Sequence, residues 1–228
     1  MADITRFQPA SDQSLMVYFG DRITPDAHRR VRALLQLLQT QPVSGVRNLH
    51  PGYGSILVKF DALTLTHDDL ERALRTRVAR LDSVQLPEPR LIQIPVYYGG
   101  AFGPDLDELA SSHQMSAERA IELHTSGDYL VYFIGFVPGF AYLGGLPDSL
   151  ATPRLSIPRR AVPAGSVAIG GHQTGVYPIA TPGGWRVIGR TPLAIFSPAR
   201  AEMSRFAIGD RVRFVSIERD EFEEMARA

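Results

Sequence analysis

The residues best suited to chemistry lie in the stretch PRLSIPRRAVPAGSVAIGGHQ, residues 153–173 of this 228-residue chain. It carries Arg154, Arg159 and Arg160 on a backbone that prolines restrict. A guanidinium group on a stiff backbone loses little entropy when it binds a carboxylate or a phosphate through paired hydrogen bonds. The segment therefore predicts an anion site. The equally weighted alternative is a surface cluster that pairs with acidic residues elsewhere.

Two further stretches place large aromatic residues beside glycine and proline: GFVPGFAYL at 135–143 and PIATPGGWRVIGR at 178–190. Proline fixes φ and glycine permits close approach, so both stretches predict rigid loops. Their aromatic rings either fill the core below or form the walls of a pocket. Trp185 is the only tryptophan and follows a Pro-Gly-Gly turn, which leaves both interpretations open.

Common self-contained catalytic signatures are missing from the sequence, including a phosphate loop, a dinucleotide fingerprint, HExxH and GxSxG. The six histidines stand singly, and His113 and His124 lack the spacing of a helical metal pair, so no metal site is expected. We interpret His124 as a residue near a helix end that the dipole favours. His172 is equally compatible with function and with a turn. Ser166 has no identifiable base, so we expect a hydrogen-bonding role.

Composition narrows the function class. The 24 basic and 24 acidic residues balance, which argues against nucleic acid as a partner. No apolar run is long enough to span a bilayer, and MADITRFQPASDQS lacks the features of a signal peptide. There is no cysteine, which excludes disulfides and fits a reducing compartment. We expect a cytoplasmic protein.

The first part of the chain predicts a ββα unit that occurs twice. Thr24 with Pro25 starts one expected helix, which ends before Pro42, and Thr66 starts the other. Two helices on one four-stranded sheet would form a two-layer sandwich. The expected strands are 4–7, 15–19, 43–49 and 55–60, with a turn over PASDQS at 9–14.

The stretch LPEPR at 86–90 marks a boundary, so we expect domains at 1–88 and 89–228. The second domain begins with a strand at 91–98 and continues with helices at 105–111 and 116–124, capped by Asp105 and Ser116. From the strand at 129–136 to Ser197, short β segments alternate with Gly and Pro turns, which is typical of an antiparallel closed barrel. A strand at 211–216 and a short helix complete the expected order.

Several of these stretches together resemble a known family. GFVPGFAYLGGLP, then PR and IPR, VPAGSVAIGGHQTGVYP and TPGGWRVIGRTP are similar to the family that contains the B subunit of 5-oxoprolinase, the kinase-A inhibitor of sporulation and the first subunit of allophanate hydrolase. The resemblance extends through IPVYYGGAFGPDLDELA, IELHTSGDYLVYFIGF and, less sharply, HPGYGSILVKFD. It implies a small α+β N-terminal domain followed by a mainly β, cyclophilin-like barrel.

The resemblance implies a shared activity. Members similar to the 5-oxoprolinase B subunit work with a C subunit, which is a homologous barrel, and with a separate A subunit. Together they open the lactam of 5-oxo-L-proline to L-glutamate at the expense of ATP. The resemblance therefore implies ATP as a co-substrate of the complex, although this chain itself has no nucleotide motif. The B and C barrels are expected to face one another around the reacting site.

By the same resemblance, the loops of GFVPGFAYL, IPRRAVPAGS and TPGGW would line this pocket. Arg159 or Arg160 would bind a substrate carboxylate or a phosphorylated intermediate, and aromatic walls would exclude water. Glycine N–H groups would stabilise an oxyanion. The predicted substrate-binding residues are Phe140, Tyr142, Arg159, Arg160, Gly165, Ser166, Gly183, Gly184 and Trp185. The general base and the nucleophile are left unassigned.

Three alternative functions stay open from the sequence. A binding module of this family inhibits a sensor histidine kinase, and such a protein would not need the pocket arginines. A component of an allophanate or urea amide-processing enzyme would keep the fold, but would require biotin or a fused ligase. A prolyl isomerase rests on barrel analogy alone, and a fold does not determine a function.

Overall fold

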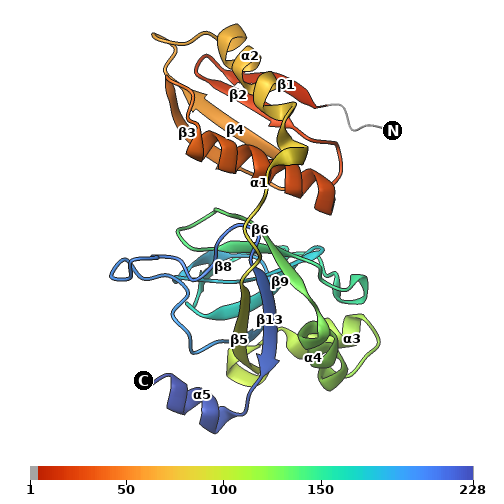
Figure 1. The fold of residues 1–228 in the computed structure, drawn as a ribbon. Helices are drawn as coiled ribbons and strands as arrows, with labels where there is room; N and C mark the ends of the chain where they lie inside the picture. The colour runs from red at the N-terminus through yellow and green to blue at the C-terminus, as the bar shows by residue number, and fades with distance from the viewer. Residues whose placement is uncertain (1–4, 228) are drawn as a thin grey trace. The chain divides into compact units, whose positions relative to one another are not determined.

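The structure is a computed structural model that describes residues 5–227. The chain forms two compact units, Met1–Glu88 and Pro89–Ala228, shown in Figure 1. Residue 4, which begins the first predicted strand, lies outside the described residues. Each unit has its own hydrophobic core.

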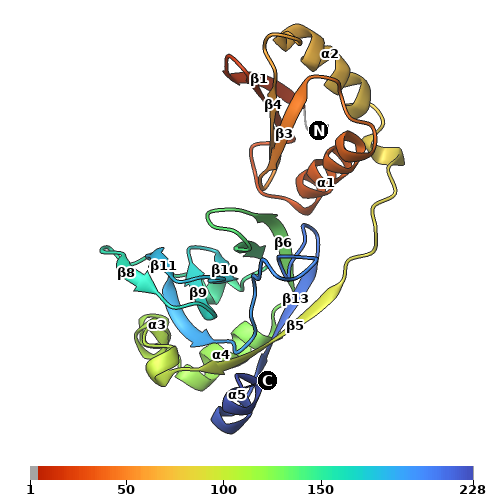
Figure 2. The ribbon, with the colours of Figure 1, turned by 90° about the vertical axis from the view of Figure 1, so that its left-hand side faces the viewer.

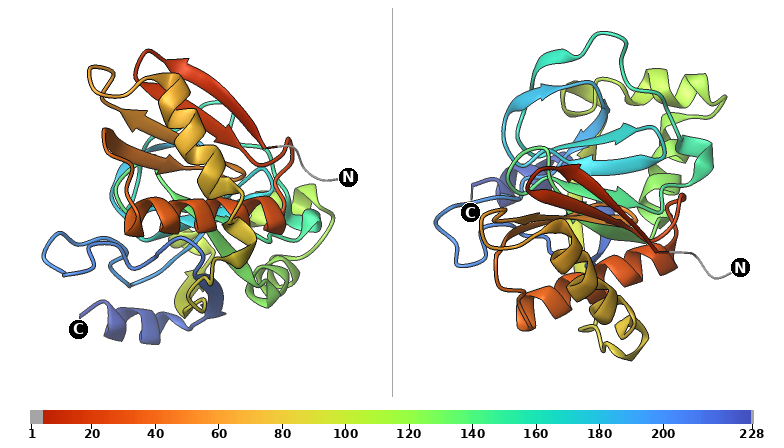
Figure 3. Two further views of the ribbon diagram at one scale, coloured as in Figure 1. Left: turned by 45° about the horizontal axis from the view of Figure 1, so that its top comes forward. Right: turned by 90° about the horizontal axis from the view of Figure 1, so that it is seen from above.

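The first unit is an antiparallel sheet with two helices. Its elements follow the order strand, strand, helix, strand, strand, helix, and the sheet order is β1-β2-β4-β3. Both helices lie on the same face of the sheet, as Figures 2 and 3 show. The elements are β1 Arg6–Ser11, β2 Ser14–Tyr18, α1 Pro25–Thr40, β3 Val46–Pro51, β4 Ser55–Phe60 and α2 His67–Val78, followed by a short 3-10 turn, η1 Leu81–Ser83.

Both helices of this unit begin where the capping residues predict. The Thr24 hydroxyl oxygen accepts a hydrogen bond from the Ala27 N–H at 3.1 Å, and Pro25 occupies the first helical position. Thr66 accepts from the Asp69 N–H at 3.2 Å. These bonds satisfy N–H groups that the helix itself leaves unpaired. The predicted helix starts are confirmed.

The first hairpin differs from the prediction. β1 extends through Pro9 to Ser11, so most of the stretch expected to be a turn is strand. The turn itself is confined to Asp12 and Gln13. A proline fits here because β1 is an edge strand of the sheet. β3 also begins later than expected, because the Val43 carbonyl accepts from the Val46 N–H in a turn.

In the described part of the second unit, seven strands close into a barrel in the order β10-β7-β6-β13-β5-β12-β9. The closed barrel and the mixed α+β class are confirmed. The strands between residues 129 and 197 pair with one another in antiparallel fashion, as predicted. Outside that stretch, β13 pairs with β5 in parallel, side by side in Figure 1, which the sequence did not indicate. The strands are β5 Leu91–Tyr98, β6 Tyr129–Ile134, β7 Ala141–Gly144, β9 Ser166–Gly170, β10 Gln173–Val176, β12 Arg186–Arg190 and β13 Arg211–Ser216.

Helices and short turns complete the barrel unit. Ser116 caps its helix through the Arg119 N–H, as predicted. Asp105 precedes its helix but makes no capping bond, so that prediction is wrong; its carboxylate serves a different purpose, described below. The helices are α3 Leu106–Ser112, α4 Ala117–Ser126 and α5 Arg219–Met225, with 3-10 turns η2 Gly100–Phe102 and η3 Asp148–Leu150. No helix among residues 5–227 combines the length and apolar character needed to cross a bilayer.

A polar network crosses the barrel core at His124, which is fully buried. The Tyr98 hydroxyl donates to its Nδ1 at 2.8 Å, and its Nε2 donates to the Thr174 hydroxyl at 2.9 Å, because that hydroxyl already donates to the Ala168 carbonyl. Burial lowers the pKa of His124 to about 3, so the ring is neutral. His124 does lie in the last turn of its helix, as the sequence predicts, but a neutral ring carries no charge for the helix dipole to favour.

A separate two-stranded sheet carries several predicted site residues beside the barrel. It pairs β8 Arg159–Val162 with β11 Thr181–Gly183, two segments that are far apart in the sequence. Gly183 lies opposite Arg159 in this pairing. The pairing therefore brings the arginine-rich segment next to the Pro-Gly-Gly turn.

Candidate functional site

A cavity of about 240 Å³ lies where the loop after β6, the segment before β8 and the end of β11 meet. All three belong to stretches that the sequence marks as rigid loops. A volume this small suits a small molecule rather than an extended one. Its lining residues are Phe136, Phe140, Tyr142, Arg154, Pro158, Tyr177, Pro182, Gly183, Gly184 and Trp185.

The cavity walls are a cluster of aromatic rings in edge-to-face contact. The Phe140 ring lies 5.0 Å from Tyr142, 5.4 Å from Tyr177 and 5.5 Å from Trp185, measured between centroids. Such contacts hold each ring in one orientation. Trp185 is only 5% exposed, so it belongs to the core and to the pocket wall at once.

Glycines in the strands beneath make room for these rings. A Cβ atom at Gly170 would stand 2.5 Å from an atom of the Trp185 indole, and one at Gly183 would stand 2.3 Å from the Tyr177 hydroxyl. Both distances are shorter than real Cβ contacts. The glycines thus allow bulky rings to lie directly against the backbone.

Phe136 gives the cavity a strained rim. It has φ +68°, a left-handed conformation that is unusual for a bulky side chain, and it is 59% exposed. The turn around it is held by the Gly135 N–H, which donates to the Phe140 carbonyl at 3.0 Å. Strain of this kind persists where the surrounding structure imposes it, and it is common at functional sites.

Arg159 is committed to the fold. Its guanidinium makes paired hydrogen bonds of 2.6 and 2.9 Å to the Asp105 carboxylate, whose side chain is 5% exposed. Asp105 also accepts from the Val187 N–H at 2.6 Å. One buried carboxylate therefore ties β8 to β12, and Arg159 acts as an anchor of this pocket rather than as a free side chain.

The arginine that lines the cavity is Arg154. Its guanidinium carbon lies 5.8 Å from the Trp185 ring centroid, within the range of a cation–π contact. The sequence placed it in the right cluster, but the prediction favoured its neighbours. Arg160 is exposed on β8 and does not line the cavity. Of the three arginines in this stretch, Arg154 lines the cavity, while Arg159 is paired with Asp105.

Gly165 and Ser166 lie away from the aromatic pocket. Gly165 lines a different cavity, and Ser166 is buried at the start of β9. The Gly165 N–H donates to the Tyr177 carbonyl at 2.7 Å, so it is not available to an oxyanion. From the stretch IPRRAVPAGS, Pro158 lines the aromatic cavity, whereas Gly165 and Ser166 do not, because the chain continues into the barrel strand β9 after β8.

The titratable side chains that line the cavity are Tyr142, Arg154 and Tyr177. Burial raises the pKa of both Tyr142 and Tyr177, so their hydroxyls stay protonated near neutral pH. No carboxylate, histidine or serine is among the lining residues of this cavity. Within residues 5–227 there is no group of three or more His, Cys, Asp or Glu side chains that could hold a metal ion. The described walls offer apolar surface and one cation, without an evident general base.

Comparisons with known proteins agree with this architecture. Residues 5–206 match the family model described as "Carboxyltransferase domain, subdomain C and D". The B subunit of 5-oxoprolinase from Bacillus subtilis (strain 168) is 39% identical over 227 residues, which cover 95% of each chain. The B subunit of 5-oxoprolinase from Escherichia coli O157:H7 is 47% identical over 194 residues, which cover 85% of this chain and 87% of that one.

A solved structure shows the same fold in a longer chain. The crystal structure of TTHA0988 superposes with a TM-score of 0.80 at 35% identity, covering 90% of this chain and 40% of that chain. This chain thus spans less than half the length of that relative. Because the family model covers most of the sequence and the Bacillus subtilis relative aligns over nearly all of it, the chain belongs to the carboxyltransferase domain, subdomain C and D, family.

Proposed function

We propose that this chain is the B subunit of a 5-oxoprolinase. The observation that carries the proposal is the 39% identity to the 5-oxoprolinase B subunit of Bacillus subtilis over 95% of both chains. The role of one component rather than of a complete enzyme is supported by the aromatic pocket, whose described lining contains no general base. A partner would have to supply the reacting groups.

The complex would open 5-oxo-L-proline to L-glutamate with ATP as co-substrate. Hydrolysis of an unstrained lactam is unfavourable for this pair unless it is coupled to another reaction. The partners would be a C subunit with a homologous barrel and a separate A subunit, and the assembly would act in the cytoplasm. The two compact units would be independently folding domains with a boundary at 88/89, the first a two-layer sandwich and the second a cyclophilin-like barrel.

The aromatic pocket would hold the lactam. A five-membered lactam ring is nearly flat and carries one carboxylate, which matches rings on several sides and one cation beside them. Phe140, Tyr142 and Trp185 would contact the ring, and Arg154 would bind the carboxylate.

The remaining predicted residues would have secondary parts. Gly183 and Gly184 line the same cavity, and the Gly184 N–H makes no hydrogen bond to another described residue, so it is the better oxyanion donor. Arg159 would position the pocket through Asp105. Arg160 would bind a phosphorylated intermediate at the surface of β8.

The test is ATP-dependent release of glutamate from 5-oxoproline. The chain is assayed alone, and then after co-expression with candidate C and A partners. We expect activity only in the full mixture. A complex that is verified as assembled by size-exclusion chromatography but releases no glutamate would overturn the proposal and shift attention to another amide substrate or to kinase inhibition.

A further inference from the structure

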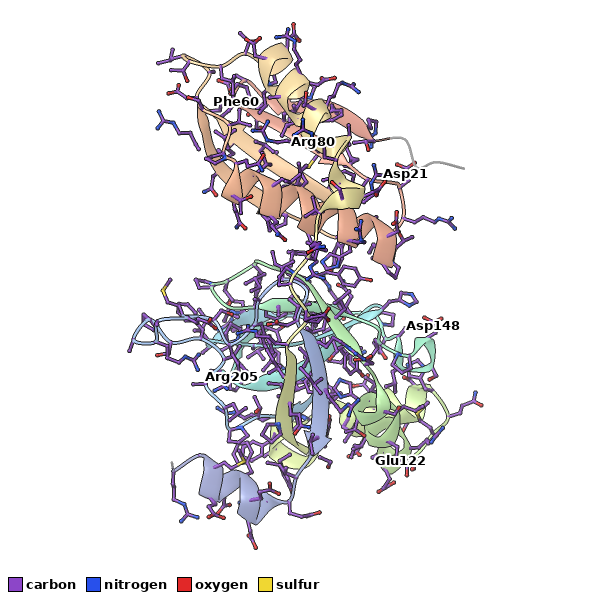
Figure 4. All side chains as sticks on the ribbon, viewed as in Figure 1. Asp21, Phe60, Arg80, Glu122, Asp148 and Arg205 are labelled. Atoms are coloured by element: carbon purple, nitrogen blue, oxygen red, sulfur yellow. The ribbon has the colours of Figure 1, made fainter. Side chains whose placement is uncertain are left out.

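A second cavity of the barrel unit carries unpaired positive charge. It has a volume of about 520 Å³ and lies beside the start of β5, with Arg90, Arg200, Glu202 and Arg205 among its lining residues. Arg205 is labelled in Figure 4. This arginine cleft shares no lining residue with the aromatic pocket. It is therefore a separate feature, and its interpretation does not rest on the proposed function.

The carboxylates near the arginine cleft are already engaged by one arginine. Arg90 donates from Nε and Nη2 to the two oxygens of Asp210, at 3.0 and 2.7 Å, and from Nη1 to Glu202 at 2.9 Å. Asp210 is buried, and it also accepts from the Ala207 N–H at 2.6 Å. Both carboxylates are thus hydrogen-bonded to Arg90.

Arg200 and Arg205 meet without a counter-charge. Nη1 of Arg200 and Nε of Arg205 both donate to the Ala194 carbonyl, at 3.0 and 3.3 Å, which places the two guanidinium groups next to each other. Neither forms an ion pair with an acidic side chain of residues 5–227. Burial, followed by the charge of Arg200, lowers the pKa of Arg205. Two adjacent cations in a partly buried wall repel each other unless an anion joins them.

The two arginines differ in what they have left to offer. Arg200 holds its own loop together, because its Nη2 also donates to the Ile195 carbonyl at 3.0 Å. Its Nε is buried and has no hydrogen-bond partner among the described residues. In the described structure, the Nη groups of Arg205 donate to no protein acceptor and are free to bind a ligand.

We propose that the arginine cleft is a binding site for a phosphate-type oxyanion, with Arg205 as the main ligand and Arg200 beside it. A phosphate near neutral pH carries up to two negative charges and several acceptor oxygens, which match two adjacent guanidinium groups. A carboxylate brings a single charge and neutralises the pair only in part. The volume exceeds that of one phosphate, so there is room for a larger molecule that carries the phosphate at one end.

The experiment is isothermal titration of the full chain with inorganic phosphate at low salt. We expect saturable binding at one site that weakens at least tenfold in Arg205→Gln. Arg119→Gln, on the exposed surface of α4, serves as the matched control, because it removes an arginine that lines neither cavity. Arg154→Gln tests whether phosphate binds in the aromatic pocket instead. The proposal is overturned if phosphate does not bind, if Arg205→Gln binds as tightly as the parent, or if Arg154→Gln alone abolishes binding.

Two further titrations identify the anion. Acetate is expected to bind at least tenfold more weakly than phosphate, and equal binding would contradict the assignment to phosphate. ATP binding that is at least tenfold tighter than that of inorganic phosphate, and that is lost in Arg205→Gln, would assign the site to a nucleotide phosphate. Weaker or equal binding of ATP would assign it to free phosphate. Because no partner protein or turnover is needed, the result is independent of the glutamate-release assay.

Discussion

Two segments of the barrel unit each carry one arginine that is bonded within the fold and one arginine that lines a cavity. In the segment that leads into β8, Arg159, the first residue of the strand, is paired with Asp105, while Arg154 faces a cavity. In the loop before β13, Arg200 holds backbone carbonyls, while Arg205 faces a cavity. In each segment we call the arginine that is bonded within the fold the anchoring arginine. We call the one that faces a cavity the presenting arginine. The difference lies in the surroundings: aromatic rings border Arg154, whereas a second cation borders Arg205.

The largest expected effect on stability is at Asp105, the partner of the anchoring Arg159. Asp105→Ala leaves Arg159 and the Val187 N–H without their shared acceptor, so we expect the free energy of unfolding to fall by about 3–5 kcal/mol. Urea denaturation measures the change. Asp148→Ala is the control, because its pair with His172 is exposed and should contribute less than about 1 kcal/mol. Equal stability of the two variants would show that Arg159 is not an anchor.

The barrel core contains a buried histidine, His124, whose contribution to the free energy of unfolding depends on pH. His124 is neutral in the folded protein down to a pKa of about 3, but its unfolded pKa is near 6.5. The unfolded chain alone gains a proton in this range, so stability is complete above pH 6.5 and falls as the pH drops toward 3. We expect a loss of about 2 kcal/mol between pH 6.5 and 5.

Urea denaturation at several pH values measures this loss. His124→Gln replaces the imidazole with an amide that can form hydrogen bonds but does not titrate. It should therefore remove that part of the pH dependence. If the parent and the variant lose stability in parallel over this range, His124 is not the group responsible.

Arg154 tests the presenting role in the aromatic pocket. Arg154→Gln keeps most of the side-chain volume and removes the charge, so kcat/KM for 5-oxoproline in the assembled complex should fall at least tenfold, about 1.4 kcal/mol of transition-state binding. The free energy of unfolding should stay within about 0.5 kcal/mol. Arg119→Gln, on the surface of α4, is the matched control. Unchanged kcat/KM in Arg154→Gln would remove Arg154 from the site.

The smallest expected effect is on stability at Arg205. Arg205→Gln removes a cation beside Arg200 and only one long hydrogen bond, so the free energy of unfolding should change by less than about 0.5 kcal/mol. Arg200→Gln loses several bonds to carbonyls and should cost about 1–2 kcal/mol. Thermal unfolding of the two variants side by side measures the difference. A larger loss of stability in Arg205→Gln than in Arg200→Gln would show that Arg205, not Arg200, is the anchoring arginine.

Local features of the fold were predictable from the sequence. Thr24 with Pro25, Thr66 and Ser116 set the helix starts, and the strands at 55–60, 91–98 and 211–216 have the predicted bounds. The hairpin turn and the parallel pairing of β13 were missed. A turn signal does not reveal how far an edge strand continues, and strand direction in a barrel depends on segments more than a hundred residues apart.

The candidate site was predictable as a set of stretches but not as individual roles. The Pro- and Gly-rich loops indicated a rigid region with aromatic rings and arginines, and the structure brings Phe140, Tyr142 and Trp185 together. Gly165 lines a different cavity, and Arg159 is paired with Asp105. No sequence signal marks Asp105 as its partner, because the two residues are 54 positions apart.

The sequence by itself determined the family, the helix starts and the composition of the loops, because these depend on short stretches of neighbouring residues. The tertiary structure alone decided which arginine anchors and which one faces a cavity, and that His124 is neutral. Charge state, pairing and exposure depend on the groups that folding brings within a few ångströms, and for Arg159, Arg154 and His124 those groups come from distant parts of the chain.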